Sequence, residues 1–234
     1  MNDGAKIDEV TAGDSSGLFL AGEKITLHSF CPSDQPRLLR DFSRARYEVF
    51  ALEQGWTVLL EISPEELVQV RRIIIAQNSH GEVIGGIYLS SIETDEGATG
   101  FSIELKSFFV CPPYRSLPVT GSRQGGLGRL LFERAFGEAK LLDASLVCYS
   151  TGLIEAAIIG LNNGFRIVEV FHLGGGLPVR TLVAMAWAPK SSLASQRQRR
   201  MQRRLLGPFD ARRFLIGFLQ KAEQVQVRRP EIGS

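Results

Sequence analysis

The chain of 234 residues is 44% hydrophobic and 22% charged, a balance typical of a globular protein rather than of a disordered chain or a collagen-like fibre. No apolar run approaches the roughly 20 residues that a membrane-spanning helix needs, which argues against an integral membrane protein. The formal net charge of +2 conceals an asymmetry. Residues 190–234 hold eleven Lys or Arg and three Asp or Glu, so this segment carries +8 and residues 1–189 carry −6.

The N-terminus and the cysteines indicate the compartment. Met1–Gly4 lacks the basic and then apolar layout of a signal peptide. Cys31, Cys111 and Cys148 are odd in number and form no Cys-x-x-Cys pair, which argues against a disulfide framework and against a zinc site. We therefore expect a cytoplasmic protein without a bound metal.

Three segments are predicted: a flexible leader over residues 1–22, ordered at most near Leu18–Leu20, a domain over 23–189, and a basic helical extension over 190–234. Apolar periodicity and capping signals predict the order of the elements. They are a strand at 25–30, a helix capped by Ser33 or Asp34 and reaching Phe50, a helix starting at Ser63, strands at 72–76, 83–89 and 101–110, a helix from the glycine loop to Leu142, a strand at 145–149, a helix at 153–161, and strands at 165–171 and 180–187. This order predicts a mixed α/β fold, with a mostly antiparallel sheet of about six to seven strands and a parallel crossover at the glycine loop.

The glycine loop is the run Arg123-Gln124-Gly125-Gly126-Leu127-Gly128, which follows a strand and opens a helix that continues with Arg129. Glycines let the backbone pass close to a ligand, and the first turn of a helix presents unpaired N–H groups and a partial positive charge. The loop is therefore a candidate cradle for a phosphate or pyrophosphate, although such a loop can also serve only as a turn. Its spacing is that of neither a P-loop nor a Rossmann fingerprint.

The residues around this loop resemble a known family. The stretch Ile103–Arg115, followed by Arg123-x-x-Gly126-x-Gly128, resembles the acyl-CoA-binding core of the GNAT superfamily of N-acyltransferases, and Leu161–Phe165 is similar to the end of that family's next helix. The resemblance spans about residues 25–188 and implies a GNAT-like fold, an acyl-CoA co-substrate and a cofactor site over residues 123–129. It also implies that the backbone of Phe109, Val110 and Cys111 pairs with pantetheine as an added strand.

One departure concerns the group that protonates the leaving thiolate. Many family members carry a tyrosine four residues before the Gly-Phe pair, where this chain has Gly160. The resemblance then leaves the role to Tyr149, Cys148, Ser150 or water, or dispenses with an acid. Tyr149 is the candidate that we carry forward.

A second pattern is similar to one branch of the superfamily. Arg46, Phe50 and Trp56 have the spacing of an N-terminal signature of acyl-homoserine-lactone synthases. These enzymes and the related N-acyl-amino-acid synthases often take acyl groups from acyl carrier protein. The resemblance implies that Arg46, Phe50, Trp56 and Tyr88 contact the acceptor. It departs at Tyr88 and Ser107, which stand where the branch has arginines, and an Arg-x-x-x-Phe pattern also occurs in ordinary GNAT members.

Glu104 is the candidate general base. It lies in the middle of a strand, six residues before Val110, where some GNAT members carry the group that deprotonates an ammonium. Burial raises the pKa of a carboxylate, which suits a base that works near neutrality. The alternative is a glutamate on the solvent side of a strand. Cys111 and Cys148 fit small buried apolar residues better than nucleophiles, because neither has a histidine nearby in the sequence.

The basic extension and the function remain open between alternatives. The extension can dock an acidic partner such as acyl carrier protein, or it can pack on the acidic body, and we expect neither nucleic acid nor a membrane as a partner. The first function class is an acyl-CoA-dependent N-acyltransferase that acts on a small-molecule amine or an amino-acid-like acceptor. The second is a carrier-protein-dependent synthase of N-acyl amino acids or of an acyl-homoserine-lactone-type signal. The third is a non-catalytic acyl-CoA-binding module.

Overall fold

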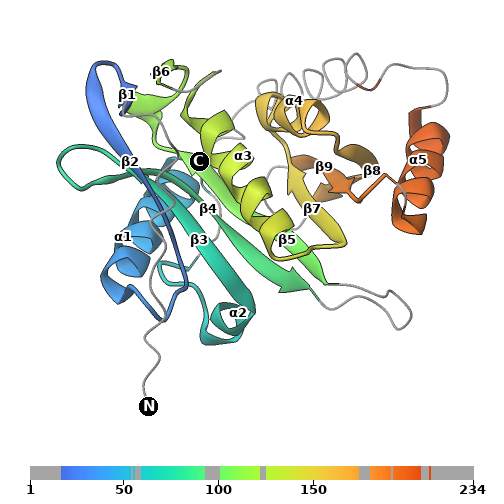
Figure 1. Ribbon diagram of the computed structural model, residues 1–234, viewed down its shortest axis with the longest axis horizontal. Coiled ribbons are helices and arrows are strands. Elements are labelled where there is room, and N and C mark those ends of the chain that lie inside the picture. Colours follow the sequence, from blue (N-terminus) through green and yellow to red (C-terminus); the bar gives the residue numbers. More distant parts are fainter. Residues whose placement is uncertain are drawn as a thin grey trace, which may run out of the picture.

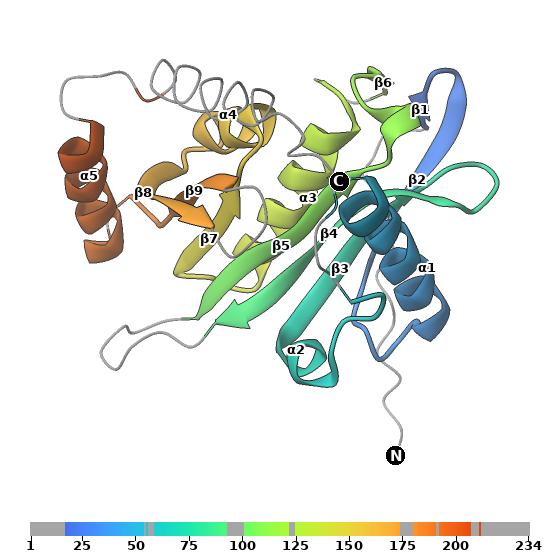
Figure 2. The same ribbon diagram turned by 180° about the vertical axis from the view of Figure 1, so that it is seen from behind.

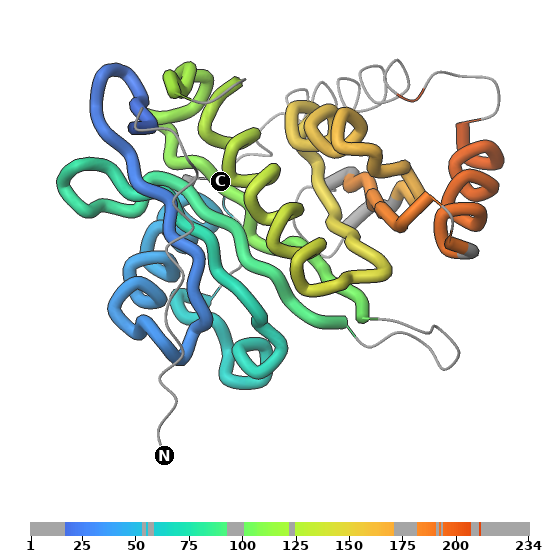
Figure 3. Tube along the Cα trace, viewed as in Figure 1, coloured from blue at the N-terminus to red at the C-terminus, as the bar shows by residue number. Residues whose placement is uncertain are grey.

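A computed structural model describes residues 17–53, 55, 59–92, 101–121, 125–173, 180–190, 192–206 and 211, which appear in colour in Figure 3. Trp56, Arg123 and Gln124 lie outside the described residues. So do the first sixteen residues of the predicted leader and nearly all of the extension after Leu206.

A nine-stranded mixed sheet forms the centre of the protein, in the order β6-β1-β2-β3-β4-β5-β7-β9-β8 (Figure 1). Neighbouring strands are antiparallel except β5 and β7, which are parallel as predicted. The strands are β1 (Leu18–Leu20), β2 (Glu23–Phe30), β3 (Val70–Gln77), β4 (Val83–Ile92), β5 (Ser102–Val110), β6 (Val119–Thr120), β7 (Leu146–Thr151), β8 (Arg166–Leu173) and β9 (Arg180–Trp187).

The predicted fold class is confirmed, but the predicted count of six to seven strands is too low. The two missing strands are β1 and β6, which pair with each other at one edge of the sheet. The sequence assigned β1 to the leader and β6 to a loop. Strands of three and two residues are too short to show the alternation on which such predictions depend.

Proline marks the start of several helices, including α1 and α2. They are α1 (Pro36–Tyr47), the π-helix η1 (Glu48–Glu53), α2 (Pro64–Gln69), the 3₁₀ turn η2 (Pro112–Tyr114), α3 (Leu127–Leu141), α4 (Ile154–Asn162) and α5 (Leu193–Leu206). Ser63 caps α2 as predicted, since its Oγ accepts a hydrogen bond from the Glu66 N–H at 3.2 Å. The predicted cap of α1 by Ser33 or Asp34 is wrong, because α1 starts after Gln35 without a side-chain cap.

Helices cover both faces of the sheet (Figures 1 and 2). On one face α3 and α4 bury an apolar core that includes Leu131, Phe132 and Phe165. On the other face α1 packs over β3, β4 and β5 through Phe42 and Phe109. The helix α5 packs against β8 at the far edge of the sheet. None of the described helices combines the length and the apolar character needed to cross a membrane.

Candidate functional site

The two parallel strands separate partway along β5. They pair only from Ser102 with Leu146 to Glu104 with Cys148, whereas β5 continues beside β4 as far as Val110. Beyond Glu104, no described strand pairs with the β7-facing edge of β5. An open backbone edge of this kind binds an extended ligand through main-chain hydrogen bonds.

A β-bulge lies at the start of this open edge. β4 pairs Gly86 with Phe109 and Tyr88 with Lys106, so β5 has one residue more than β4 between the two pairs. Within the bulge Ser107 has a φ of 50°, a left-handed conformation that is uncommon for a residue with a side chain. A bulge leaves backbone groups outside the ladder and re-aims the side chains that follow it.

The bulge divides β5 between the two faces of the sheet. Before it, Glu104 and Lys106 point to the face of α1 and α2, where Lys106 reaches a carboxylate of α2. After it, Phe108 and Val110 point to the opposite face, where both side chains border Gly128 of α3. One strand therefore supplies charged groups to one side of the sheet and an apolar floor for α3 to the other.

The backbone hydrogen bonds of β5 show which of the three predicted pantetheine contacts faces the open edge. The Cys111 N–H donates to the Ile84 carbonyl of β4 at 2.9 Å, and the Cys111 carbonyl accepts from the Tyr114 N–H at 3.0 Å. Since successive N–H groups of a strand point to opposite edges, the N–H of Val110 faces the open edge. Of the predicted trio Phe109, Val110 and Cys111, Val110 has the orientation that a ligand on this edge requires.

The N-terminus of α3 lies beside β5. Gly126 is its N-cap residue, and the Leu130 N–H makes the first helical hydrogen bond to the Gly126 carbonyl at 3.2 Å. The N–H groups of Leu127, Gly128 and Arg129 therefore have no acceptor within the helix, and they form the kind of site at which a helix N-terminus binds phosphate. A Cβ added to Gly126 would lie 3.1 Å from the Leu117 carbonyl oxygen, so this turn has little room for a side chain.

Four side chains form a hydrogen-bonded and ion-paired series on the α1 and α2 face, which we call the charged row: Glu104, Lys106, Glu66 and Tyr88. Lys106 Nζ lies 3.4 Å from Glu104 Oε2 and 3.4 Å from Glu66 Oε1, and the Tyr88 hydroxyl donates to Glu66 Oε1 at 2.5 Å. Burial by itself favours a neutral Lys106, but the two carboxylates outweigh it and raise the pKa of Lys106. Burial, reinforced by Glu66, also raises the pKa of Tyr88, so its hydroxyl keeps its proton.

Glu104 is the member of this row that lies next to β7, where it pairs with Cys148. Its side chain is 30% exposed, which is enough for a small molecule to reach the carboxylate. The predicted base is therefore placed beside the opening between β5 and β7, and Lys106 fixes its position.

The predicted acceptor residues gather on the same face. Arg46, in the last turn of α1, is buried and interacts electrostatically with Tyr88 and Glu66. The Phe50 ring of η1 packs edge-on against Phe109 with ring centroids 6.1 Å apart. The structure thus brings together Arg46, Phe50 and Tyr88, while Trp56 lies outside the described residues.

The Tyr149 hydroxyl lies against Gly160, the position at which a tyrosine was expected, although Tyr149 belongs to another element. It lies on β7, is 5% exposed, and its hydroxyl donates to the Ala156 carbonyl of α4 at 2.9 Å. A Cβ on Gly160 would lie 1.9 Å from that hydroxyl, so the glycine makes room for the phenol. Burial raises the pKa of Tyr149 well above its usual range. As an acid, Tyr149 would have to break the bond to Ala156, and the geometry favours a role in locking α4 onto β7.

Cys148 lies next to Glu104 across the parallel pair. Burial, and after it the charge of Glu104, raises the pKa of the Cys148 thiol to about 12. The thiol therefore stays protonated near neutrality, which argues against a nucleophile, although Cys148 is only partly buried and not fully buried as expected. Among the described residues, no group of three or more His, Cys, Asp or Glu side chains is placed to hold a metal ion.

A separate open groove of ≈ 830 Å³ lies between α1 and the ends of β4 and β5. Its lining includes Arg37, Asp41 and Glu48 from the helices and Pro112 and Tyr114 beyond β5. None of the residues of the charged row lines it, so this groove and the candidate chemistry do not coincide.

Two members of the charged row were not predicted as site residues. Lys106 was passed over, although its position two residues after Glu104 placed both on one face of the strand. Glu66 was not predicted as a site residue either. Its contact with Tyr88 and Lys106 joins segments 22 and 40 residues apart, and no local pattern reports such a contact.

The comparisons bear on the fold alone. No family model and no curated protein matches the sequence. Among solved structures, a candidate acetyltransferase from Acinetobacter baylyi is similar with a TM-score of 0.51 and 12% identity, over 75% of this chain and 97% of that one. A GNAT-family acetyltransferase from Streptococcus pneumoniae has a TM-score of 0.48 and 14% identity, over 71% of this chain and 100% of that one.

The fold is that of the GNAT acetyltransferases. A ribosomal-protein-alanine N-acetyltransferase from Brucella melitensis is also similar, with a TM-score of 0.48 and 20% identity over 70% of this chain and 99% of that one. At 12% identity, the likeness to the Acinetobacter structure shows the fold alone, and that fold agrees with the predicted class. The activity has to be argued from the site.

Proposed function

We propose that the protein is an N-acyltransferase that moves an acyl group from an acyl-CoA thioester to the amine of a small molecule. One observation carries the proposal: β5 and β7 separate beside Glu104, and the edge that opens there runs past the N-terminus of α3. In this assignment the diphosphate of CoA lies on the free N–H groups of Leu127–Arg129, and the pantetheine arm extends along Leu105–Val110. The thioester then ends close to Glu104.

The chemistry needs few groups. Glu104 takes a proton from the acceptor ammonium, and the neutral amine attacks the thioester carbonyl carbon. A main-chain N–H group on the open edge of β5, near the bulge and the thioester, stabilises the oxyanion of the tetrahedral adduct. As the adduct collapses, the C–S bond breaks, and one of the two protons left on the attacking nitrogen passes to the departing sulfur directly or through water. The products are an amide and the free thiol of CoA.

The cradle assignment is tested by filling the glycine loop. Gly126→Val adds a branched side chain where even a Cβ would lie 3.1 Å from the Leu117 carbonyl oxygen. We expect acetyl-CoA binding, measured by calorimetry, to weaken about tenfold or more, equivalent to about 1.4 kcal/mol. Gly137→Val in the same helix is the matched control, because a Cβ at Gly137 meets no atom within 4 Å. If both variants bind acetyl-CoA as tightly as the wild type, with circular dichroism unchanged, the glycine loop does not bind the diphosphate.

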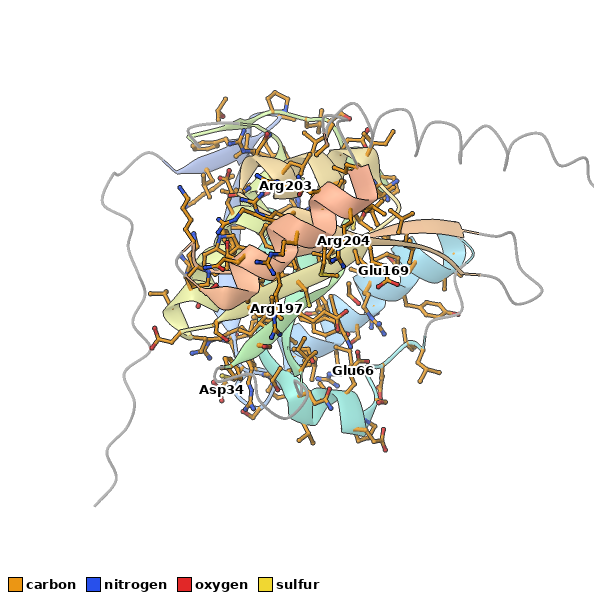
Figure 4. All side chains as sticks on the ribbon, turned by 90° about the vertical axis from the view of Figure 1, so that its right-hand side faces the viewer. Asp34, Glu66, Glu169, Arg197, Arg203 and Arg204 are labelled. Carbon is orange, nitrogen blue, oxygen red and sulfur yellow. The ribbon has the colours of Figure 1, made fainter. Side chains whose placement is uncertain are left out.

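A second candidate donor is the thioester of an acidic acyl carrier protein, and the feature that favours it is α5. Figure 4 shows Arg197, Arg203 and Arg204 along this helix. Burial, followed by the positive charges of Arg199 and Arg203, lowers the pKa of Arg166 on β8. Within the part of the chain that the structure describes, no carboxylate forms an ion pair with an arginine of α5. A concentrated positive charge of this kind attracts an acidic partner.

A further inference from the structure

The side chains of β7 alternate regularly between the two faces of the sheet, because its pairing with β9 shows no register shift. Tyr149 belongs to the core beneath α3 and α4. Cys148 lies on the opposite face, where the charges of Glu104 and Lys106 act on its thiol. Since successive side chains of a strand point to opposite faces, Ser150 lies on the same face as Cys148 and the charged row.

Ser150 lies at the place where β5 and β7 separate. The two strands pair as far as Cys148, which is opposite Glu104. Ser150 is two residues further along β7, about 6.6 Å at the usual rise of a strand, and it pairs with Ala184 of β9 but with no residue of β5. The residue is exposed, and no hydrogen bond within the described part of the chain uses its hydroxyl. A ligand that enters the opening can therefore bond to this hydroxyl.

The same opening receives the sulfur of the proposed donor. In the proposed function, CoA enters at the N-terminus of α3 beside Val110, and the thioester ends close to Glu104. The sulfur precedes the acyl carbonyl along this path, so it lies on the Val110 side of Glu104. Because β5 and β7 are parallel, Ser150 lies on that side of Glu104 as well. The base and the hydroxyl therefore flank the reacting thioester from one face of the sheet.

We propose that Ser150 relays a proton to the departing sulfur. This inference rests on the proposed function and names a further catalytic residue for it. After the neutral amine has attacked, the nitrogen of the adduct carries two protons. As the C–S bond breaks, the Ser150 hydroxyl gives its proton to the sulfur and takes one proton from the nitrogen. The amide and the thiol of CoA leave, and the serine is unchanged.

The other hydroxyl and thiol groups of β7 fit this role less well. The Tyr149 hydroxyl is buried on the far face and donates to a carbonyl of α4 at 2.9 Å. Burial raises the pKa of the Cys148 thiol to about 12, which makes it a weaker proton donor than an ordinary thiol. Thr151 Oγ1 accepts a hydrogen bond from the Leu153 N–H at 3.0 Å, at the start of α4. Of these groups, the Ser150 hydroxyl alone is exposed on the face of the base.

The first experiment compares Ser150→Ala with Ser150→Thr, which keeps a hydroxyl and suits a strand. The wild-type protein is offered acetyl-CoA with each of the twenty L-amino acids, spermidine and glucosamine, and the variants are assayed with the best acceptor. We expect Ser150→Ala to lower the single-turnover rate about tenfold, less than a positioned acid usually contributes because water can replace the hydroxyl. Ser150→Thr should keep most of the rate, and calorimetry should show unchanged affinity for acetyl-CoA in both variants. Equal rates in Ser150→Ala and the wild type, or equal losses in both variants, overturn the proposal.

The second experiment changes the leaving group. The selenoester analogue of acetyl-CoA differs only at the sulfur, and a selenol is a much stronger acid than a thiol, so a selenolate departs without a proton. We expect the loss caused by Ser150→Ala to disappear with the selenoester. Tyr149→Phe is the matched control, because it removes the neighbouring hydroxyl of β7 from the other face. An equal loss with both donors in Ser150→Ala, or a loss in Tyr149→Phe that the selenoester removes, overturns the proposal.

The activity of the wild-type protein separates this inference from the proposed function. If the wild type transfers the acetyl group to none of the amines, the proposed function is overturned, and the relay with it. If the wild type is active and Ser150→Ala is equally fast in a single turnover, only the role of Ser150 is overturned. A slow Ser150→Ala variant, whose rate both a threonine and the selenoester restore, supports the relay.

Discussion

The contact between Tyr149 and Gly160 gives a sharp prediction about stability. In Gly160→Ala, the new Cβ would lie 1.9 Å from the Tyr149 hydroxyl oxygen and 2.9 Å from ring carbon Cζ, distances that require the ring to move. The hydroxyl would lose its 2.9 Å hydrogen bond to the Ala156 carbonyl. Position 160 therefore requires glycine because a side chain would collide with Tyr149, and not because the backbone conformation demands it.

The magnitude follows from three effects. Overpacking of a core costs about 1–3 kcal/mol, and an unsatisfied buried hydroxyl costs about 1–3 kcal/mol. Replacing glycine by alanine within a helix by itself stabilises the folded state by about 1 kcal/mol. We therefore expect Gly160→Ala to lower the free energy of unfolding by about 1–5 kcal/mol. Gly137→Ala in α3, where the added Cβ meets no atom within 4 Å, should instead stabilise by about 0.5–1 kcal/mol.

Urea denaturation of the two glycine variants, and of Tyr149→Phe with and without Gly160→Ala, is the assay. Removing the hydroxyl takes away the nearest atom, so the double variant should recover part of the loss, and only part because Cζ remains too close. A Gly160→Ala protein as stable as the wild type would refute the packing argument. Turnover by Tyr149→Phe tests the predicted acid separately, since a fall in kcat at unchanged stability would return that role to the phenol.

Three further predictions concern the site and the extension. Glu104→Gln should keep acetyl-CoA binding but lower turnover roughly 10²–10⁴-fold, and its turnover should recover only at high pH, where free amine is abundant. A variant with wild-type turnover at pH 7 would show that Glu104 has no catalytic role. The pKa of the Cys148 thiol is raised from 9.0 to about 12, so between these values the folded state keeps a proton that the unfolded state loses. The contribution of this thiol to stability should therefore be complete below pH 9 and should decline as the pH rises toward 12. Alkylation of Cys148, followed by peptide mapping in native and in urea-unfolded protein, measures the two titrations. Deleting residues 191–234 should slow transfer from a carrier-bound donor more than from acyl-CoA, with a difference that shrinks at high salt; equal losses at every salt concentration would mark the extension as part of the domain.

Much of the fold was predictable because the signals are local. The seven longer strands, the cap at Ser63 and the glycine loop each depend on a few neighbouring residues, and the parallel crossover follows from the order of the elements. Order within the leader was expected only near Leu18–Leu20, and these residues form β1, which pairs with β2 and with β6. The pairing with β6 joins Phe19 to Thr120, two residues so far apart in the sequence that periodicity within a window cannot show it.

The site was predictable residue by residue but not as an arrangement. Glu104, Arg46 and Tyr88 were named in advance, through a family resemblance. The sequence could not show that Lys106 and Glu66 link Glu104 to Tyr88, because these contacts cross three elements. Nor could it place the bulge at Ser107, since an extra residue in one strand is defined only by the register of its neighbour.

The bulge in β5 changes which side chains of the strand face each side of the sheet. Glu104 and Lys106, before Ser107, lie on the face on which we place the acceptor, whereas Phe108 and Val110, after it, border Gly128 of α3 on the opposite face. Substitutions at Glu104 or Lys106 can therefore alter which amine is accepted without disturbing the floor beneath α3. Deleting one residue at the bulge would exchange the two faces and abolish both. In the proposed function, the acceptor and the donor therefore contact opposite faces of β5, and the extra residue in the bulge is what turns Phe108 and Val110 toward α3.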